Sequence, residues 1–135
     1  MGRIINIEGI GPVYKQVLKQ KAGIVTTEAL LKASATPKQR EELAAKTGIG
    51  HKLILEWANL ADLFRIKGVA EEYADLLEEA GVDTVVELAQ RNAEKLFAAL
   101  KATNDRKALV RRLPALSQVK SWIAQAKKLP RALIY

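Results

Sequence analysis

The sequence predicts an all-α protein made of two related halves, each with about four to five short helices, that share one core. Three observations predict this fold. Apolar residues recur at the spacing of one helix face, and β-branched residues nowhere alternate over a useful length. The second half also repeats the residue order of the first. With 135 residues, 49% of them hydrophobic, the chain can build a real core.

Residues 1–63 make up the first half, and its first helix has a clear start and end. Proline suits the first helical position, so we expect the helix to begin at Pro12. We expect it to end at Gly23, where a left-handed cap needs no Cβ. The apolar face expected to point inward consists of Val13, Tyr14, Val17 and Leu18.

Three more helices are predicted in this half. Thr26 and Thr36 are candidate N-caps of the second and third helices, because a threonine hydroxyl accepts a hydrogen bond from a free amide of the first turn. Residues 47–50, Thr-Gly-Ile-Gly, then break the chain. The fourth helix is expected to run from about His51 to Leu63.

Residues 64–129 make up the second half, and residues 130–135 are predicted to form a C-terminal tail whose apolar end docks on the body or on a partner. The helices of this half are marked by the same kinds of residue. The first of them is expected to follow Gly68 and to end at Gly81. The next two are expected to begin at Thr84 and Asn92. A fourth would begin at Asn104 or Asp105 and end before Pro114, and the last would begin at Ser117.

The two halves share one order of residues at a nearly constant offset. The offset is 59 residues at the first pairs, 58 in the middle and 65 at the last pair, which places an insertion around residues 104–113. An ancestral duplication explains this order, and it makes Trp57 and Trp122 equivalent core residues. The matched pairs are Gly9 and Gly68, Tyr14 and Tyr73, Gly23 and Gly81, Thr26 and Thr84, and Trp57 and Trp122.

The composition limits the chemistry and suggests a polyanionic partner. Cysteine is absent and there is one histidine, which excludes disulfides, thiolate metal sites and multi-histidine metal centres. The net charge is +7, and residues 100–135 carry nine Lys or Arg against one Asp. Such a basic block attracts polyanions, although an uneven solvated surface is the plainer interpretation. No apolar stretch approaches a membrane span, and we expect a cytoplasmic protein.

Two short glycine segments carry the functional prediction. Gly9-Ile10-Gly11 precedes one predicted helix, and Gly48-Ile49-Gly50 precedes another. Glycines allow a tight turn. The amides of the turn, together with the unpaired amides that begin the next helix, then form a concave site for one phosphate. Lys15 and Lys52 are near enough in sequence to add a positive charge.

These segments resemble the helix-hairpin-helix motif of non-sequence-specific DNA-binding proteins, in which hairpin amides bind phosphates, sometimes with a bound monovalent cation. A third copy at Ile66–Val69 departs from the motif. Ala70 replaces the second glycine, and Glu71 and Glu72 would repel a phosphate, so we interpret it as structural or protein-binding. A fourth copy at residues 112–117 lacks the glycine pair.

The chain as a whole, over roughly residues 4–129, is similar to a bacterial family of tandem helix-hairpin-helix proteins known as domain of unknown function 4332. This resemblance implies tandem helix-hairpin-helix repeats, but no activity, because a fold alone does not supply one. The segments that carry it are Ile7–Pro12, Leu53–Trp57, Arg65–Val69, Ala80–Val85 and Leu113-Pro114.

We therefore expect a non-catalytic module that binds nucleic-acid backbone phosphates without sequence specificity, with DNA as the expected partner. The alternative is a protein-interaction or scaffold module with structural hairpins, in which the acidic face of residues 71–79 or the tail holds a partner. No nucleophile–base or carboxylate pair suggests an enzyme, and no small-molecule substrate or metal is expected. The candidate site residues are Gly9, Gly11, Lys15, Gly48, Gly50, His51 and Lys52, with Arg111, Arg112, Lys120, Lys127 and Lys128 as auxiliary charges.

Overall fold

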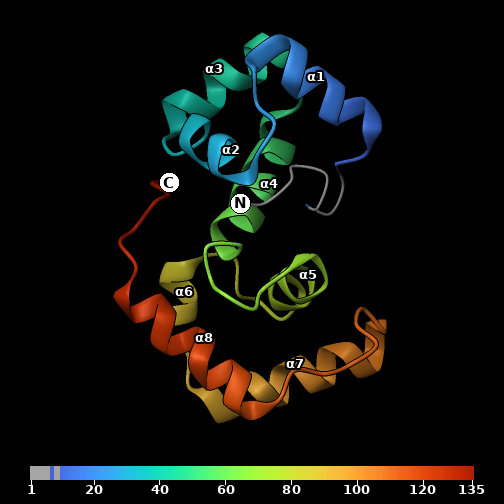
Figure 1. Cartoon of the computed structure of the whole chain (residues 1–135), viewed down its shortest axis with the longest axis vertical. Coiled ribbons are helices and arrows are strands. Elements are labelled where there is room, and N and C mark those ends of the chain that lie inside the picture. The colour runs from blue at the N-terminus through green and yellow to red at the C-terminus, as the bar shows by residue number, and fades with distance from the viewer. Residues whose placement is uncertain (1–6, 8–9) are drawn as a thin grey trace. The chain divides into compact units, whose positions relative to one another are not determined.

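The computed structural model describes residue 7 and residues 10–135. Within these residues the regular structure is helical, and eight helices follow one another along the chain (Figure 1). The prediction of an all-α protein is confirmed, while the tandem helix-hairpin-helix arrangement stays a prediction. None of the helices in the described ranges has the length and apolar character needed to cross a membrane.

The chain falls into two compact units. Unit 1 comprises Met1–Asp62 together with Arg131–Tyr135, and unit 2 comprises Leu63–Pro130. The break between residues 62 and 63 lies one residue from the predicted border of the halves. The predicted tail is divided, because its residues 131–135 belong to unit 1.

The first four helices begin and end where the sequence predicts. Gly23 ends the first helix in the left-handed conformation, with φ of 68°. The hydroxyl of Thr26 accepts from the amide of Ala29 at 3.1 Å, and Thr36 forms a capping box with Gln39. The helices are α1 (Pro12–Ala22), α2 (Thr27–Ala33), α3 (Pro37–Thr47) and α4 (His51–Leu63).

The next four helices keep the same order, with two departures from the prediction. No helix begins at Asn104 or Asp105, since α7 continues through both. Asn104 instead closes the following loop, where its Oδ1 accepts from the amide of Val110 at 2.9 Å. Ser117 is not an N-cap either, because α8 starts one residue before it. The helices are α5 (Glu71–Glu79), α6 (Val85–Ala89), α7 (Ala93–Lys107) and α8 (Leu116–Lys128).

One aromatic pair packs inside each unit. In unit 1, Tyr14 of α1 meets Trp57 of α4 edge to face, with ring centroids 5.1 Å apart. In unit 2, Tyr73 of α5 meets Trp122 of α8 at 5.4 Å. Both indoles are buried, which confirms the core prediction for them. The two pairs occupy matched positions of the repeat.

The apolar face of α1 is narrower than predicted. Leu18 is fully buried, but Val13 is 75% exposed. Val13 lies in the first turn of α1, beside the stripe that runs from Tyr14 to Leu18, so it falls outside the packed face.

The loop after α7 supplies a stability prediction. Ala108 follows the helix in the left-handed conformation with φ of 50°, and it is the sole non-glycine with positive φ in the described ranges. Replacing Ala108 with Gly should raise the free energy of unfolding by about 0.5–1 kcal/mol, because glycine adopts this conformation without strain. Urea unfolding followed by circular dichroism measures the change.

The matched control is Ala102→Gly, at an exposed position inside α7. This change should lower stability by about 1 kcal/mol, because glycine is a poor helix former. Two losses of equal size would show that the strain at Ala108 does not exist.

Candidate nucleic-acid interface

The start of α1 is open toward solvent. Gly11 is its N-cap, in an extended conformation, and the carbonyl of Gly11 accepts from the amide of Lys15 at 3.0 Å. A Cβ placed on Gly11 would meet no atom of the described residues within 4 Å. The first turn contains no acidic residue, and Lys15 is exposed. The positive end of this helix therefore keeps its attraction for an anion. Gly9 lies outside the described residues.

The second glycine bend separates α3 from α4. Gly48 adopts the left-handed conformation, and its amide donates to the carbonyl of Ala44 at 2.9 Å. Ile49 is 6% exposed, and its amide donates to the hydroxyl of Thr47 at 3.2 Å. The buried side chain of Ile49 thus anchors the bend between two exposed glycines. Gly50 is one of these, and it directly precedes α4.

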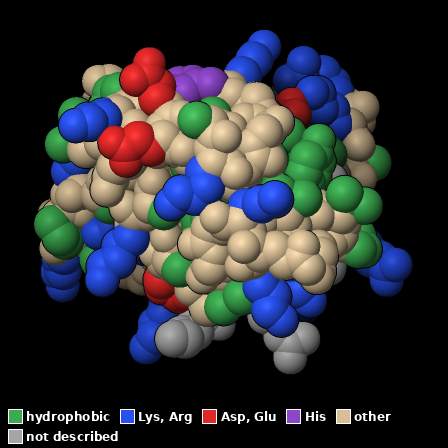
Figure 2. Space-filling model, turned by 90° about the horizontal axis from the view of Figure 1, so that it is seen from above, with side chains coloured by type: hydrophobic (Ala, Val, Ile, Leu, Met, Phe, Trp, Pro, Cys, Tyr) green, Lys and Arg blue, Asp and Glu red, His purple; other side chains and the backbone are tan. Residues whose placement is uncertain are grey.

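The residues that open α4 are exposed and carry no negative charge. His51 and Lys52 both face solvent, and the first turn of α4 has no acidic residue. A Cβ on Gly50 would meet open space, as at Gly11. On the face shown in Figure 2, the histidine lies at the surface, with Asp or Glu side chains beside it and Lys and Arg side chains scattered over the same face. Lys52 supplies a positive charge at this helix start.

The third bend, before α5, is occupied by the protein itself. The side chain of Gln125 forms two hydrogen bonds with the backbone of Lys67. The Lys67 amide donates to Oε1 at 2.8 Å, and Nε2 donates to the Lys67 carbonyl at 3.1 Å. Glu71 and Glu72 stand in the first turn of α5. This bend lacks a free amide at Lys67 and has two carboxylates at the helix start, which agrees with a structural role.

Gly68 in the same bend is required by packing. Its φ is +94°, and a Cβ there would lie 3.1 Å from Nε1 of Trp122. The turn itself is common to both units, because Val69 donates to the carbonyl of Ile66 as Ile10 donates to that of Ile7. In unit 2, this bend therefore packs against the indole ring of Trp122.

The auxiliary basic residues lie in unit 2, whereas the described residues of the first two glycine bends lie in unit 1. All five are exposed. Nζ of Lys120 lies 3.8 Å from Oε1 of Glu94. Because both side chains are exposed, this ion pair offsets part of the local positive charge but does not hold Lys120 in one position. The carbonyl of Arg112 accepts from the hydroxyl of Tyr73 at 3.0 Å. The structure groups the predicted residues by unit, with Gly11, Lys15, Gly48, Gly50, His51 and Lys52 in unit 1 and Arg111, Arg112, Lys120, Lys127 and Lys128 in unit 2.

Two other features of the described residues stand apart from the bends. In α5, Asp75, Glu78 and Glu79 bring carboxylate oxygens within 4.8 Å of one another, but Glu79 already forms an ion pair with Lys107.

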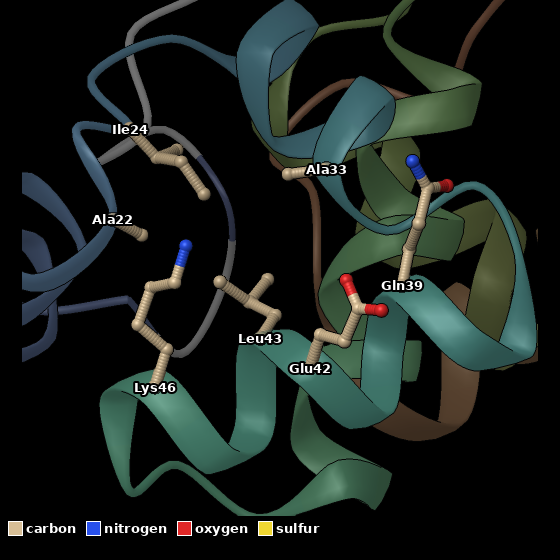
Figure 3. A pocket seen from close by; sticks show the side chains of 7 residues that line it. All are labelled: Ala22, Ile24, Ala33, Gln39, Glu42, Leu43 and Lys46. Atoms are coloured by element: carbon tan, nitrogen blue, oxygen red, sulfur yellow. The ribbon is translucent and has the colours of Figure 1, made fainter.

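In unit 1, α1, α2 and α3 border a cavity of about 170 Å³ (Figure 3), which is small beside typical ligand pockets of about 300–1,000 Å³. Its apolar wall includes Ile24 and Leu43, and none of the predicted site residues lines it.

Gln125 was not among the predicted site residues. Counting back by the offset of the tryptophan pair, its equivalent in unit 1 is Leu60, which is buried. The aligned repeat therefore contains one signal, because Gln125 is polar where the equivalent residue of the other half is apolar. This difference distinguishes the bend that the protein itself occupies from the open bends.

The chain belongs to the family described as domain of unknown function DUF4332, whose model matches residues 8–129. No curated protein and no solved structure shows a significant match. The resemblance proposed from the sequence is confirmed at the level of this family.

The bends differ in their tolerance of a methyl group. Gly68→Ala should lower the free energy of unfolding by about 2–3 kcal/mol, because it combines strain at positive φ with a contact against Trp122. Urea unfolding followed by tryptophan fluorescence measures the loss.

Gly50→Ala is the matched change in unit 1 and should cost less than about 1 kcal/mol, since its Cβ meets open space and only the preference for glycine at an N-cap is lost. Equal losses at Gly50 and Gly68 would contradict the distinction between the open and the occupied bend.

Proposed function

We propose that unit 1 binds the phosphates of a nucleic-acid backbone, without sequence preference, through the starts of α1 and α4. One observation carries the proposal: Gly11 and Gly50 each precede a helix whose first turn lacks acidic residues, and open space surrounds the position of each missing Cβ. The corresponding bend of unit 2 is occupied by Gln125 and flanked by two glutamates.

Each helix start would hold one phosphate. The partial positive charge of a helix N-terminus, about half an elementary charge, favours an anion there, and the unpaired amides of the first turn point toward it. Pro12 has no amide hydrogen, so the start of α1 offers one donor fewer than the start of α4. Glycine lets the phosphate approach the backbone closely. Lys15 and Lys52 would add full charges nearby. Such contacts recognise the backbone and leave the bases unread, so binding is independent of sequence.

The basic residues of unit 2 would add to the overall positive field of the chain. Arg111, Arg112, Lys120, Lys127 and Lys128 belong to the block of residues 100–135, which carries nine Lys or Arg against one Asp. A field of this kind raises the rate of encounter with a polyanion and weakens as salt is added. Affinity should therefore be modest and steeply salt-dependent, with a loss of roughly one power of salt concentration per phosphate contact.

A protein-interaction module is the second candidate. The observation that favours it is the occupied bend of unit 2, since the same turn there serves packing and not anion binding. In that case the acidic first turn of α5, with Glu71 and Glu72, would face a basic partner.

A duplex-DNA titration by fluorescence anisotropy at about 50 mM and about 200 mM salt tests the proposal. The Gly11→Glu, Gly50→Glu double variant should bind at least about tenfold more weakly than the parent chain and show a shallower salt dependence, because carboxylates then occupy both helix starts. Both glycines have ordinary φ values and open surroundings, so the double variant should keep its circular dichroism spectrum.

The control places the same two charges at the equivalent N-caps of unit 2, as Ala70→Glu with Ala115→Glu. Both alanines are exposed N-cap residues. This variant has the same net charge as the first and should weaken binding by less than about threefold. Absence of binding at low salt, or equal weakening by the two folded variants, would remove the helix starts as the site.

A further inference from the structure

Unit 1 is completed by residues that follow unit 2 in the chain. Arg131–Tyr135 belongs to unit 1, although the preceding residues 63–130 form unit 2. Leu133 is 2% exposed, and the amide of Ile134 donates to the carbonyl of Ala35 at 2.8 Å. The segment therefore contributes both a buried side chain and a backbone hydrogen bond to unit 1.

The buried side chain of Arg40, in α3, binds this segment. It is 2% exposed, and its guanidinium donates to the carbonyl of Ser34 at 2.8 Å and to that of Ile134 at 2.7 Å. The guanidinium carbon also lies 5.7 Å from the ring centroid of Tyr135. Burial lowers the pKa of Arg40, and Tyr135 opposes this shift. A buried charge is tolerated where hydrogen bonds replace water, and one of these bonds comes from the segment.

Further hydrogen bonds join the chain where it leaves and re-enters each unit. In unit 1, the hydroxyl of Tyr135 donates to Oδ1 of Asn59 at 2.6 Å, and Asn59 is three residues before the chain leaves that unit. In unit 2, Nη2 of Arg65 donates to the carbonyl of Pro130 at 2.6 Å. Each of these bonds connects a residue near the first passage between units to a residue at the second.

The segment buries little apolar surface. Leu133 is its one fully buried large side chain, while Ile134 and Tyr135 are more than half exposed. Elements that bury little apolar surface open locally at a lower free energy than the whole domain. We therefore expect the segment to open at a lower free energy than the helices of unit 1.

We propose that Arg131–Tyr135 is a releasable strap of unit 1, locked by Arg40, that opens separately from the helices of that unit. This inference is independent of the nucleic-acid proposal.

Limited trypsin digestion of the full chain tests the strap, because cleavage after the exposed Arg131 liberates residues 132–135, which mass spectrometry detects. Leu133→Ala should speed this cleavage at least about tenfold, since it removes the buried anchor. Ile134→Ala is the matched control and should change the rate by less than about twofold, because that side chain is 55% exposed and its backbone bonds remain.

Arg40→Met tests the lock separately and should also speed the release of residues 132–135. Equal cleavage rates in the parent chain, Leu133→Ala and Arg40→Met would overturn the proposal. Hydrogen exchange of the unaltered chain tests the strap without any substitution, so this measurement does not depend on whether the variants fold. The Ile134 amide should exchange more slowly than an exposed loop amide and faster than the amides of Trp57 and Ala58 in α4. Exchange as slow as that of α4 would show that the strap does not open by itself.

Discussion

The packing of one tryptophan beneath one glycine turn constrains unit 2, and the same aromatic pair recurs in unit 1. A Cβ on Gly68 would lie only 3.1 Å from Nε1 of Trp122, so even a methyl group is crowded there, and Tyr73 of α5 packs against the same indole. Tyr14 and Trp57 form the equivalent pair. Once the core of each unit is fixed in this way, the bends that precede the helices can diverge. The bend before α5 is tied to Gln125, while those before α1 and α4 present open glycines.

Local chemistry explains why most of the fold could be predicted from the sequence. Thr26 and Thr36 cap the helices that follow them, and Gly23 ends α1 with a positive φ, each by interactions within a few residues. The repeat placed Trp57 and Trp122 in the core, because equivalent residues of a duplication bury the same face. The open bend at Gly48 and Gly50 also followed from local sequence, since glycine spacing and the helix start are adjacent.

What could not be predicted depends on residues far apart in the chain. Gln125 reaches Lys67 across 58 residues, and Arg40 reaches Ile134 across 94. A single sequence carries no signal for such pairs except where the repeat exposes an unexpected polar residue. Asn104 was misassigned for a related reason: its side chain can cap a helix start or close a loop, and the choice depends on where Val110 lies.

The central claim is that the helix starts of unit 1 are open to oxyanions while the bend of unit 2 is closed. Two-dimensional ¹⁵N–¹H spectra of the chain, recorded during addition of a short DNA duplex at low salt, test it residue by residue. We expect the largest shifts at the amides of Gly11, Gly50, His51 and Lys52, with little change at Lys67. Shifts confined to unit 2, or as large at Lys67 as at Gly50, would contradict it.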